Sequence, residues 1–248
     1  SELVVRATVQ AKAEDGSTLF NHRSWVAPDL AGLPSTEQMV ADLQGAARWL
    51  KRLQTAEPET EYLGPVLFAP EAAAELFRQL LQPQICGTPP MEAAPDNASQ
   101  DARPIPTSRI GRRILPAGWR VVDDAQRNPA LMGSMTHDYE GVETRAVTVI
   151  EDGVLRDVLM SRTPRADREQ STGHARGMAA DRFEAMPTQV HITPRKARSW
   201  KRLRRQALSL AKSAGLSHVL IVKRLSPPSM EENLEFSVTG DEPMAGLT

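Results

Sequence analysis

Apolar and polar residues alternate over the first part of the chain. Leu3, Val5, Ala7 and Val9 are separated by single residues, and apolar residues return within 19–26 after a turn-forming series at 14–17. A period of two is typical of a half-buried strand, and two such runs around a Gly-containing turn indicate a hairpin. The pattern therefore predicts a β-hairpin over residues 3–26.

The spacing then changes to that of a helix. Ser35 and Gln38 have the spacing of a capping box, in which the hydroxyl accepts a hydrogen bond at the start of a helix. The apolar residues that follow recur at intervals of three and four, which places them on one helical face. They are Met39, Leu43, Ala46, Leu50 and Leu53. We expect this helix to end before Pro58.

A short apolar run at 62–68 leads directly into a second helical pattern. The run fits a buried strand, and Pro70 suits the first position of a helix, where its missing N–H would have no partner in any case. Apolar residues recur at helical spacing up to Leu81, and Pro83 is expected to end the helix. Residues 83–116 are rich in proline and in small or polar residues, which predicts a loop.

Strand patterns dominate the rest of the chain. We expect strands at 119–123 and 188–193, two strands within 142–159 joined by an Asp-Gly turn, a buried strand at 217–225 and a last one at 234–238. A helix is predicted over 195–214, with Gly215 as its terminator. Hairpins outnumber parallel crossovers. The predicted fold class is therefore α+β, with largely antiparallel, curved sheets and a few packed helices.

Length and composition narrow the class of protein. The chain has 248 residues, 40% of them hydrophobic, and a formal net charge of -1, which gives no reason to expect a polyanion or a membrane as partner. It has no apolar run of the roughly 18–20 residues that cross a bilayer, and no basic-then-apolar leader, so we expect a soluble, cytoplasmic protein. We expect one domain: a hairpin, helix and strand-to-helix junction at 1–82, the Pro-rich loop at 83–116, and a hairpin-rich remainder at 117–248.

Four motifs follow one another at a particular spacing. A strand-to-helix junction occupies 62–74, and an Asp-Asp pair, a Gly-Ser pair and an Asp-x-Glu-Gly series lie within 119–142. A hairpin follows at 149–155, and a Thr-Gly-x-x-Arg turn lies within 171–177. In this order they resemble the TldD/PmbA family, once called modulators of DNA gyrase. The resemblance implies the fold of that family's carboxy-terminal domain.

The resemblance also implies where a zinc ion would lie. In zinc-bearing members the strand-to-helix junction runs into a His-Glu-x-x-x-His motif, in which imidazoles on one helical face hold the metal and the Glu takes a proton from bound water. The corresponding positions, counted from the Gly-Pro pair of the junction, are Arg78, Gln79 and Gln82. Arg is a permanent cation and Gln amides are poor zinc ligands. We therefore expect no cofactor, because the zinc site of the family is lost.

The resemblance implies a role and partners as well. Within the family a zinc-bearing subunit works with a related zinc-free subunit, and this chain looks more like the second kind. Its substrate would be a peptide or an unfolded protein, and its partner a second copy or a TldD-like subunit, with no membrane involved. The family's separate amino-terminal domain looks absent, and the start at Ser1 suggests a piece of a longer protein.

Several side chains of the second and fourth motifs are candidates for a site. His137, Asp138, Glu140 and His174 have groups that bind metals or transfer protons. On an extended segment Asp138 and Glu140 would point to one side and His137 to the other. The simpler alternative is that the carboxylates accept backbone N–H groups or pair with Arg176.

A turn at Gly173 is the other candidate. Glycine invites a positive φ there, and Ser171, Thr172 and His174 around it could bind the backbone or carboxylate of a peptide. An ordinary turn, with its hydrogen bonds satisfied within the chain, explains the same residues.

Two rival functions remain open. One is peptide hydrolysis at a rearranged site of His137, Glu140 and His174. The other is nucleic-acid binding by the basic residues of the predicted helix at 195–214. The balanced charge and the few aromatic residues favour a solvated or partner-facing helix instead, so we do not expect nucleic acid as a partner. Cys86 has no histidine near it in sequence and is interpreted as a bystander thiol.

Overall fold

The computed structural model describes residues 3–56, 61–88, 109–131, 133–179, 182–225 and 238–239. The chain forms two compact units. Unit 1 comprises Ser1–Glu75 and Ser199–Thr248, and unit 2 comprises Leu76–Arg198. The predicted division into 1–82, 83–116 and 117–248 of one domain stays a prediction, because units defined by contacts need not coincide with the domain of a family.

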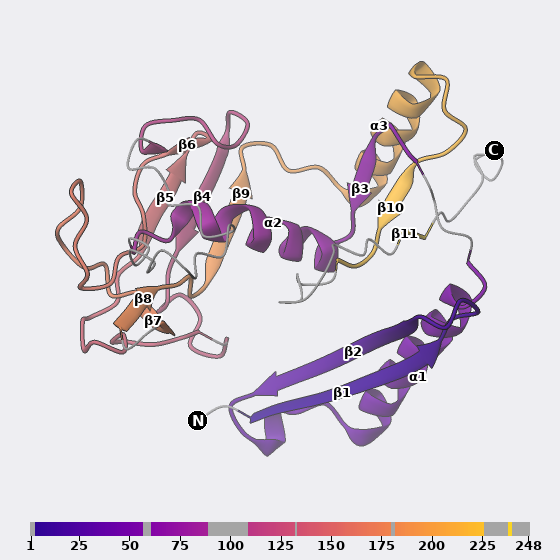
Figure 1. Cartoon of the computed structure of the whole chain (residues 1–248), viewed down its shortest axis with the longest axis horizontal. Helices are drawn as coiled ribbons and strands as arrows, with labels where there is room; N and C mark the ends of the chain where they lie inside the picture. The colour runs from indigo at the N-terminus through magenta and orange to yellow at the C-terminus, as the bar shows by residue number, and fades with distance from the viewer. Residues whose placement is uncertain are drawn as a thin grey trace, which may run out of the picture. The chain divides into compact units, whose positions relative to one another are not determined.

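Unit 1 begins with a long hairpin covered by a helix (Figure 1). Strands β1 (Leu3–Lys12) and β2 (Thr18–Ala27) pair antiparallel over their whole length. Helix α1 (Thr36–Leu53) follows the short 3₁₀ turn η1 (Leu30–Gly32) and is capped by Ser35, which accepts a hydrogen bond from the Gln38 backbone N–H. The helix buries Ala46 and Leu50, and the indole of Trp25 donates to Asp42 at 3.1 Å.

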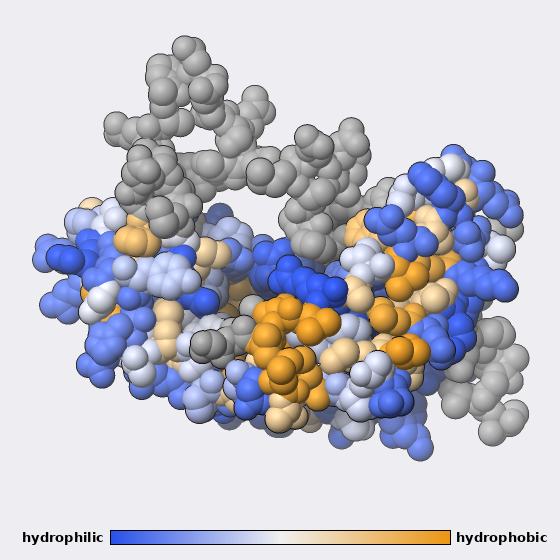
Figure 2. All heavy atoms as spheres, turned by 90° about the horizontal axis from the view of Figure 1, so that it is seen from below, coloured by the Kyte–Doolittle hydropathy of each residue, from blue (hydrophilic) through white to orange (hydrophobic). Residues whose placement is uncertain are grey.

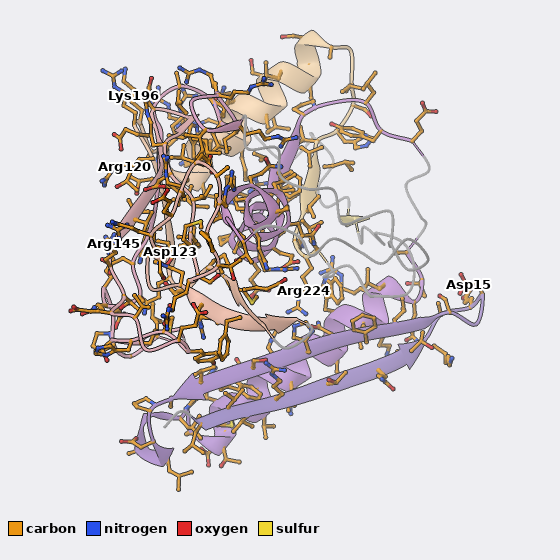
Figure 3. The ribbon with its side chains drawn as sticks, turned by 60° about the vertical axis from the view of Figure 1, so that its left-hand side comes forward. Asp15, Arg120, Asp123, Arg145, Lys196 and Arg224 are labelled. Carbon is orange, nitrogen blue, oxygen red and sulfur yellow. The ribbon has the colours of Figure 1, made fainter. Side chains whose placement is uncertain are left out.

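A small mixed sheet forms the rest of unit 1. Its order is β11 (Val238–Thr239), β10 (Leu220–Val222), β3 (Val66–Phe68), and helix α3 (Trp200–Ser213) packs near β3. Strands β10 and β3 are parallel. The guanidinium of Arg224 joins this sheet to the hairpin layer, since it donates to Asn21, lies 5.7 Å from the centre of the Trp49 ring and pairs with Glu71 at 3.4 Å (Figure 3).

Unit 2 is built around a four-stranded antiparallel sheet. Its order is β6 (Val154–Leu155), β5 (Val147–Glu151), β4 (Trp119–Asp123), β9 (Val190–Pro194). A separate hairpin joins β7 (Ala175–Ala179) to β8 (Arg182–Ala185). Helix α2 (Pro70–Ile85) enters this unit with its carboxy-terminal half and packs Leu81 and Ile85 into the core beside Val121.

The predicted fold class is confirmed. Nearly all pairings among the described strands are antiparallel, the exception being β3 with β10. The hairpins at 3–26 and around the Asp-Gly turn are present; Asp152 and Gly153 have φ angles of 50° and 76°, as a two-residue primed turn requires. Gly215, with φ of 72°, ends α3. None of the described helices is long and apolar enough to cross a membrane. Hydrophilic residues predominate on the face shown in Figure 2, where apolar residues gather in patches.

Some predicted boundaries are wrong. Helix α2 runs through Pro83 to Ile85, because a proline in the last turn removes only one helical hydrogen bond and Ile85 gains complete burial. Residues 142–146 and 156–159 are not in strands. Helix α3 starts at Trp200 rather than at 195, since Ser199 caps it. The β7–β8 hairpin was not predicted. Of the predicted Pro-rich loop, 89–108 lie outside the described residues, as do 234–237 of the predicted last strand.

Candidate functional site

Asp138 closes a tight turn in unit 2. Its Oδ1 accepts hydrogen bonds from the backbone N–H groups of Glu140 and Val142, both at 2.9 Å, and its Oδ2 accepts one from Ala175 at 3.0 Å. The segment is therefore a turn, so the side-chain directions given above for an extended segment do not apply, and the carboxylate of Asp138 accepts backbone N–H groups as in the simpler alternative. The carboxylate replaces the missing backbone partners of three N–H groups, as a short acidic side chain can do in a turn.

The turn at Gly173 lies directly beside the Asp138 turn. The backbone N–H of Tyr139 donates to the Ala175 carbonyl at 2.9 Å, so the second and fourth motifs of the sequence meet here. Gly173 has a φ of 74°, as predicted, and a Cβ at this position would come within 2.7 Å of Thr144 Cα. Only glycine fits both the backbone conformation and the space.

Met160 anchors the Gly173 turn to the core. Its backbone N–H donates to Thr172 Oγ1 at 2.8 Å, and its carbonyl accepts from the Thr172 N–H at 3.2 Å and from the Ser171 hydroxyl at 3.2 Å. Ser171 also accepts from the Gly173 N–H at 3.0 Å. These hydrogen bonds fix the conformation of the turn without a ligand.

His174 is completely buried beside Asp123. The ring Nε2 lies 3.1 Å from Asp123 Oδ1, and Nδ1 lies 2.9 Å from Thr172 Oγ1. Asp123, also fully buried, accepts in addition from the backbone N–H of Thr188 at 2.8 Å and from the Thr188 hydroxyl. Nδ1 also lies 2.9 Å from the Thr172 carbonyl, so each ring nitrogen faces an oxygen that can accept a hydrogen bond. This network ties the Gly173 turn to the end of β4.

A cavity of about 310 Å³ opens at this turn. Its walls carry both signs of charge, and Asp157 pairs with Arg168 at 2.9 Å. The lining residues are Arg145, Asp157, Met160, Asp167, Arg168, Glu169, Gln170 and Thr172. Arg145, like Asp123, is labelled in Figure 3. The volume is at the low end of that of small-ligand sites, which hold roughly 300–1,000 Å³. A polar cavity beside a rigid turn can bind a short stretch of peptide backbone.

The structure brings most of the candidate residues together, but not as a catalytic group. His137 is exposed and contacts Thr136, and Glu140 accepts a hydrogen bond from the Arg162 N–H at 2.6 Å. His174 uses both ring nitrogens inside the core. The guanidinium of Arg176 lies against Gly133, where a Cβ would be 2.9 Å from its Nη1. Whether the turn residues bind peptide stays a prediction.

The face of α2 that would carry the zinc ligands carries an arginine and a glutamine that bind each other. Arg78 Nη1 donates to Gln82 Oε1 at 3.3 Å, one helical turn away. A His-Glu-x-x-x-His series that starts at Arg78 places its second histidine at Pro83, one residue beyond Gln82, and proline has no side-chain atom that could bind zinc. Within the described ranges, no three His, Cys, Asp or Glu side chains are close enough to hold a metal ion. The residues at these positions do not fit a zinc ion.

Cys86 is not chemically activated. Burial raises the pKa of its thiol to about 12, and the negative charges of Asp123 and Glu184 act in the same direction. The thiolate is the nucleophilic form, so a thiol with this pKa stays protonated and unreactive near neutral pH.

Alkylation should show this protection. At pH 8 we expect iodoacetamide to modify Cys86 of the folded chain roughly a thousand times more slowly than a free cysteine, with a rate that rises about tenfold per pH unit. Mass spectrometry of quenched samples measures the rate, and the chain unfolded in urea is the control. Equal rates for the folded and unfolded chain would contradict the protected thiol.

The sequence argument missed two groups that complete the site. Asp123 was noted only as part of an Asp-Asp motif and Thr188 only as a strand residue, yet Asp123 binds His174 and Thr188 in turn binds Asp123. An Asp-Asp pair at the end of a strand is a signal for one buried and one exposed carboxylate, because strand side chains alternate in direction. Asp123 is fully buried, whereas Asp124 is partly exposed.

Comparison with known proteins agrees with this α+β fold. Residues 60–242 match the family described as the PmbA/TldA metallopeptidase C-terminal domain. The chain belongs to this family. It is 28% identical over 166 residues to the metalloprotease PmbA of Escherichia coli O157:H7, which covers 66% of the chain and 34% of that protein. It is also 28% identical over 126 residues to an uncharacterized protein of Methanocaldococcus jannaschii, which covers 51% of the chain and 27% of that protein.

Solved structures show the same fold. A candidate modulator of a DNA gyrase from Thermotoga maritima matches with a TM-score of 0.61 and 18% identity, over 90% of the chain and 45% of that structure. TldE from Thermococcus kodakarensis matches with a TM-score of 0.53 and 16% identity, over 92% and 46% respectively. The chain therefore spans less than half the length of each of these relatives.

Proposed function

We propose that this chain is a zinc-free subunit of a cytoplasmic assembly that handles peptides or unfolded proteins, in which it supplies scaffold and part of the substrate channel. One relative is named a metalloprotease and another TldE, and the family description contains the word metallopeptidase. The observation that carries the zinc-free part is the α2 face, where Arg78 donates to Gln82 and where neither Gln82 nor Pro83 supplies an imidazole.

The cavity at the Gly173 turn supports a channel role. Its turn is held rigid by Met160, Asp138 and His174, so little conformational entropy would be lost when a peptide binds there. The rearranged hydrolytic site gains no support, because a completely buried His174 cannot reach a substrate and Glu140 already binds the backbone of Arg162. Hydrolysis by the assembly would then depend on a zinc ion in a TldD-like partner.

Metal analysis tests the proposal. We expect the purified chain to retain no stoichiometric zinc through dialysis, as measured by elemental mass spectrometry. A variant with Arg78→His and Gln82→His gains two imidazoles a turn apart on one helical face and is the positive control, which should bind zinc in a titration. Stoichiometric zinc in the unmodified chain would refute the zinc-free assignment.

Assembly is measured separately. Mixed with a zinc-bearing TldD-like subunit, the chain should elute with that subunit in size-exclusion chromatography. Chelator-sensitive cleavage of an unstructured peptide should then require the zinc-bearing subunit. Cleavage by this chain alone that disappears in Glu140→Ala would instead support the rearranged site.

A further inference from the structure

The cavity at the Gly173 turn is lined by two side chains of opposite charge that have no partner. Arg145 and Glu169 both line it, and neither makes a hydrogen bond or an ion pair within the part of the chain that the structure describes. Both side chains are exposed, so a ligand can reach them. An ion pair would bring a nitrogen and an oxygen within 4.0 Å of each other, so the two charged groups lie further apart than that. A cation and an anion therefore face one cavity with a gap between them.

The other charged side chains of the lining neutralise one another or a neighbour. Asp157 pairs with Arg168 at 2.9 Å. Both carboxylate oxygens of Asp167 accept from Arg165, at 2.9 and 3.3 Å, and the Arg165 side chain is only 5% exposed. Two parallel hydrogen bonds of this kind hold a carboxylate firmly. The charges left for a ligand are those of the two unpaired side chains.

An amide side chain and the size of the cavity narrow the choice of ligand. Gln170 lines the cavity and has no hydrogen-bond partner among the described residues. Its carboxamide can donate and accept, as a peptide group does. The volume of about 310 Å³ corresponds to about ten water molecules at roughly 30 Å³ each. A ligand of the size of a free amino acid or a dipeptide fits.

We propose that this cavity binds a free dipeptide as a zwitterion, with its α-carboxylate on Arg145, its α-ammonium on Glu169 and its peptide group against Gln170. A guanidinium binds a carboxylate through two parallel hydrogen bonds, and an ammonium offers three donors to a carboxylate such as that of Glu169. The interior of a long chain has neither terminal group. A free dipeptide has both, and hydrolysis of peptides releases such products. The inference thus rests on the proposed function and names the ligand of the same cavity.

A titration of the intact chain followed by NMR tests the proposal. The probe is the dipeptide Ala-Leu, compared with its N-acetylated form, which lacks the ammonium, and with its terminal amide, which lacks the carboxylate. We expect Ala-Leu to shift the amide signals of Gln170 and Thr172 and to leave those of β1 and β2 unchanged. Each blocked form should bind roughly three- to tenfold more weakly, between the contributions of an exposed ion pair and of a charged hydrogen bond. Free leucine, which has both charges but no peptide group, should also bind more weakly.

Two variants assign each charge to its partner. In Glu169→Gln, acetylation of the dipeptide should cost no further affinity, whereas the amide should still bind more weakly. In Arg145→Gln the pattern should be reversed. Such a crossed result measures the coupling between two specific groups, and a general change in charge or folding does not produce it. Glu143→Gln and Arg162→Gln are the matched controls, because both residues are exposed and lie outside the lining, and they should leave every affinity within about twofold.

Four results would overturn the inference. Ala-Leu could fail to bind, its blocked forms could bind as tightly as the free dipeptide, the two site variants could lack the crossed pattern, or leucine could bind as tightly as Ala-Leu and so remove the need for a peptide group. Zinc content and co-elution with a TldD-like subunit are measured on the same preparation. Failure of the dipeptide site therefore stays distinct from failure of the proposed subunit role.

Discussion

Asp123→Asn should destabilise unit 2 by about 1–3 kcal/mol or more, because it leaves at least one buried hydrogen-bond donor without its acceptor. The carboxylate is fully buried and accepts from His174 Nε2, from the Thr188 N–H and from the Thr188 hydroxyl. An amide presents an NH₂ group where one of those oxygens was, so at least one buried donor faces another donor. Each unsatisfied buried donor costs about 1–3 kcal/mol.

The measurement must report on unit 2 alone. Three of the four tryptophans, Trp25, Trp49 and Trp200, belong to unit 1, so total fluorescence would mix the two units. Hydrogen exchange of peptides from β4 and β5 in increasing denaturant isolates the effect. We expect the protection of these strands to fall while that of β1 and β2 is unchanged.

Asp124→Asn is the matched control for this prediction. The neighbouring carboxylate caps a surface turn by accepting from the Gln126 N–H at 3.1 Å, and an Asn oxygen can accept the same bond. We expect a change below about 0.5 kcal/mol, the usual range for surface substitutions. Equal losses in the two variants would show that the Asp123–His174 network contributes little.

Local signals made much of the fold predictable from the sequence. A helix cap, a primed turn and a terminating glycine are each decided by a few adjacent residues. Ser35 caps α1, Asp152 and Gly153 make the turn between β5 and β6, and Gly215 ends α3 as expected. The error at Pro83 arose because the prediction used only adjacent residues. The proline predicted a helix end, but the helix continues to Ile85, which is completely buried.

The parts that escaped prediction depend on distant partners. The β7 segment Ala-Arg-Gly-Met-Ala has weak strand propensity, and the hairpin is held by Asp138 through Ala175 and by His174, whose carbonyl accepts from the Met186 N–H at 3.0 Å. His174 and Asp123 are 51 positions apart. No spacing rule pairs residues at such a separation. The motifs could therefore be identified in the sequence, but the hydrogen bonds between their polar groups could not.

Asp138→Ala should also be strongly destabilising, by about 3 kcal/mol or more. The substitution leaves the N–H groups of Glu140, Val142 and Ala175 without their acceptor. Each loss costs about 1–3 kcal/mol where water cannot replace the carboxylate. Asp138 is only 6% exposed, so replacement by water is limited. Because Ala175 begins β7, the effect should be largest in the β7–β8 hairpin, where hydrogen exchange should accelerate first.

Glu140→Gln distinguishes the hydrogen-bonding role of Asp138 from a general effect of removing one negative charge at the turn. Glu140 accepts a single backbone bond, from the Arg162 N–H, and the Gln side-chain oxygen can accept it as well. We expect a cost below about 1 kcal/mol and unchanged exchange in β7. If Glu140→Gln proved as damaging as Asp138→Ala, the carboxylates would act through their charge. The turn would then have to be explained as an electrostatic site and not as a set of side-chain acceptors for backbone N–H groups.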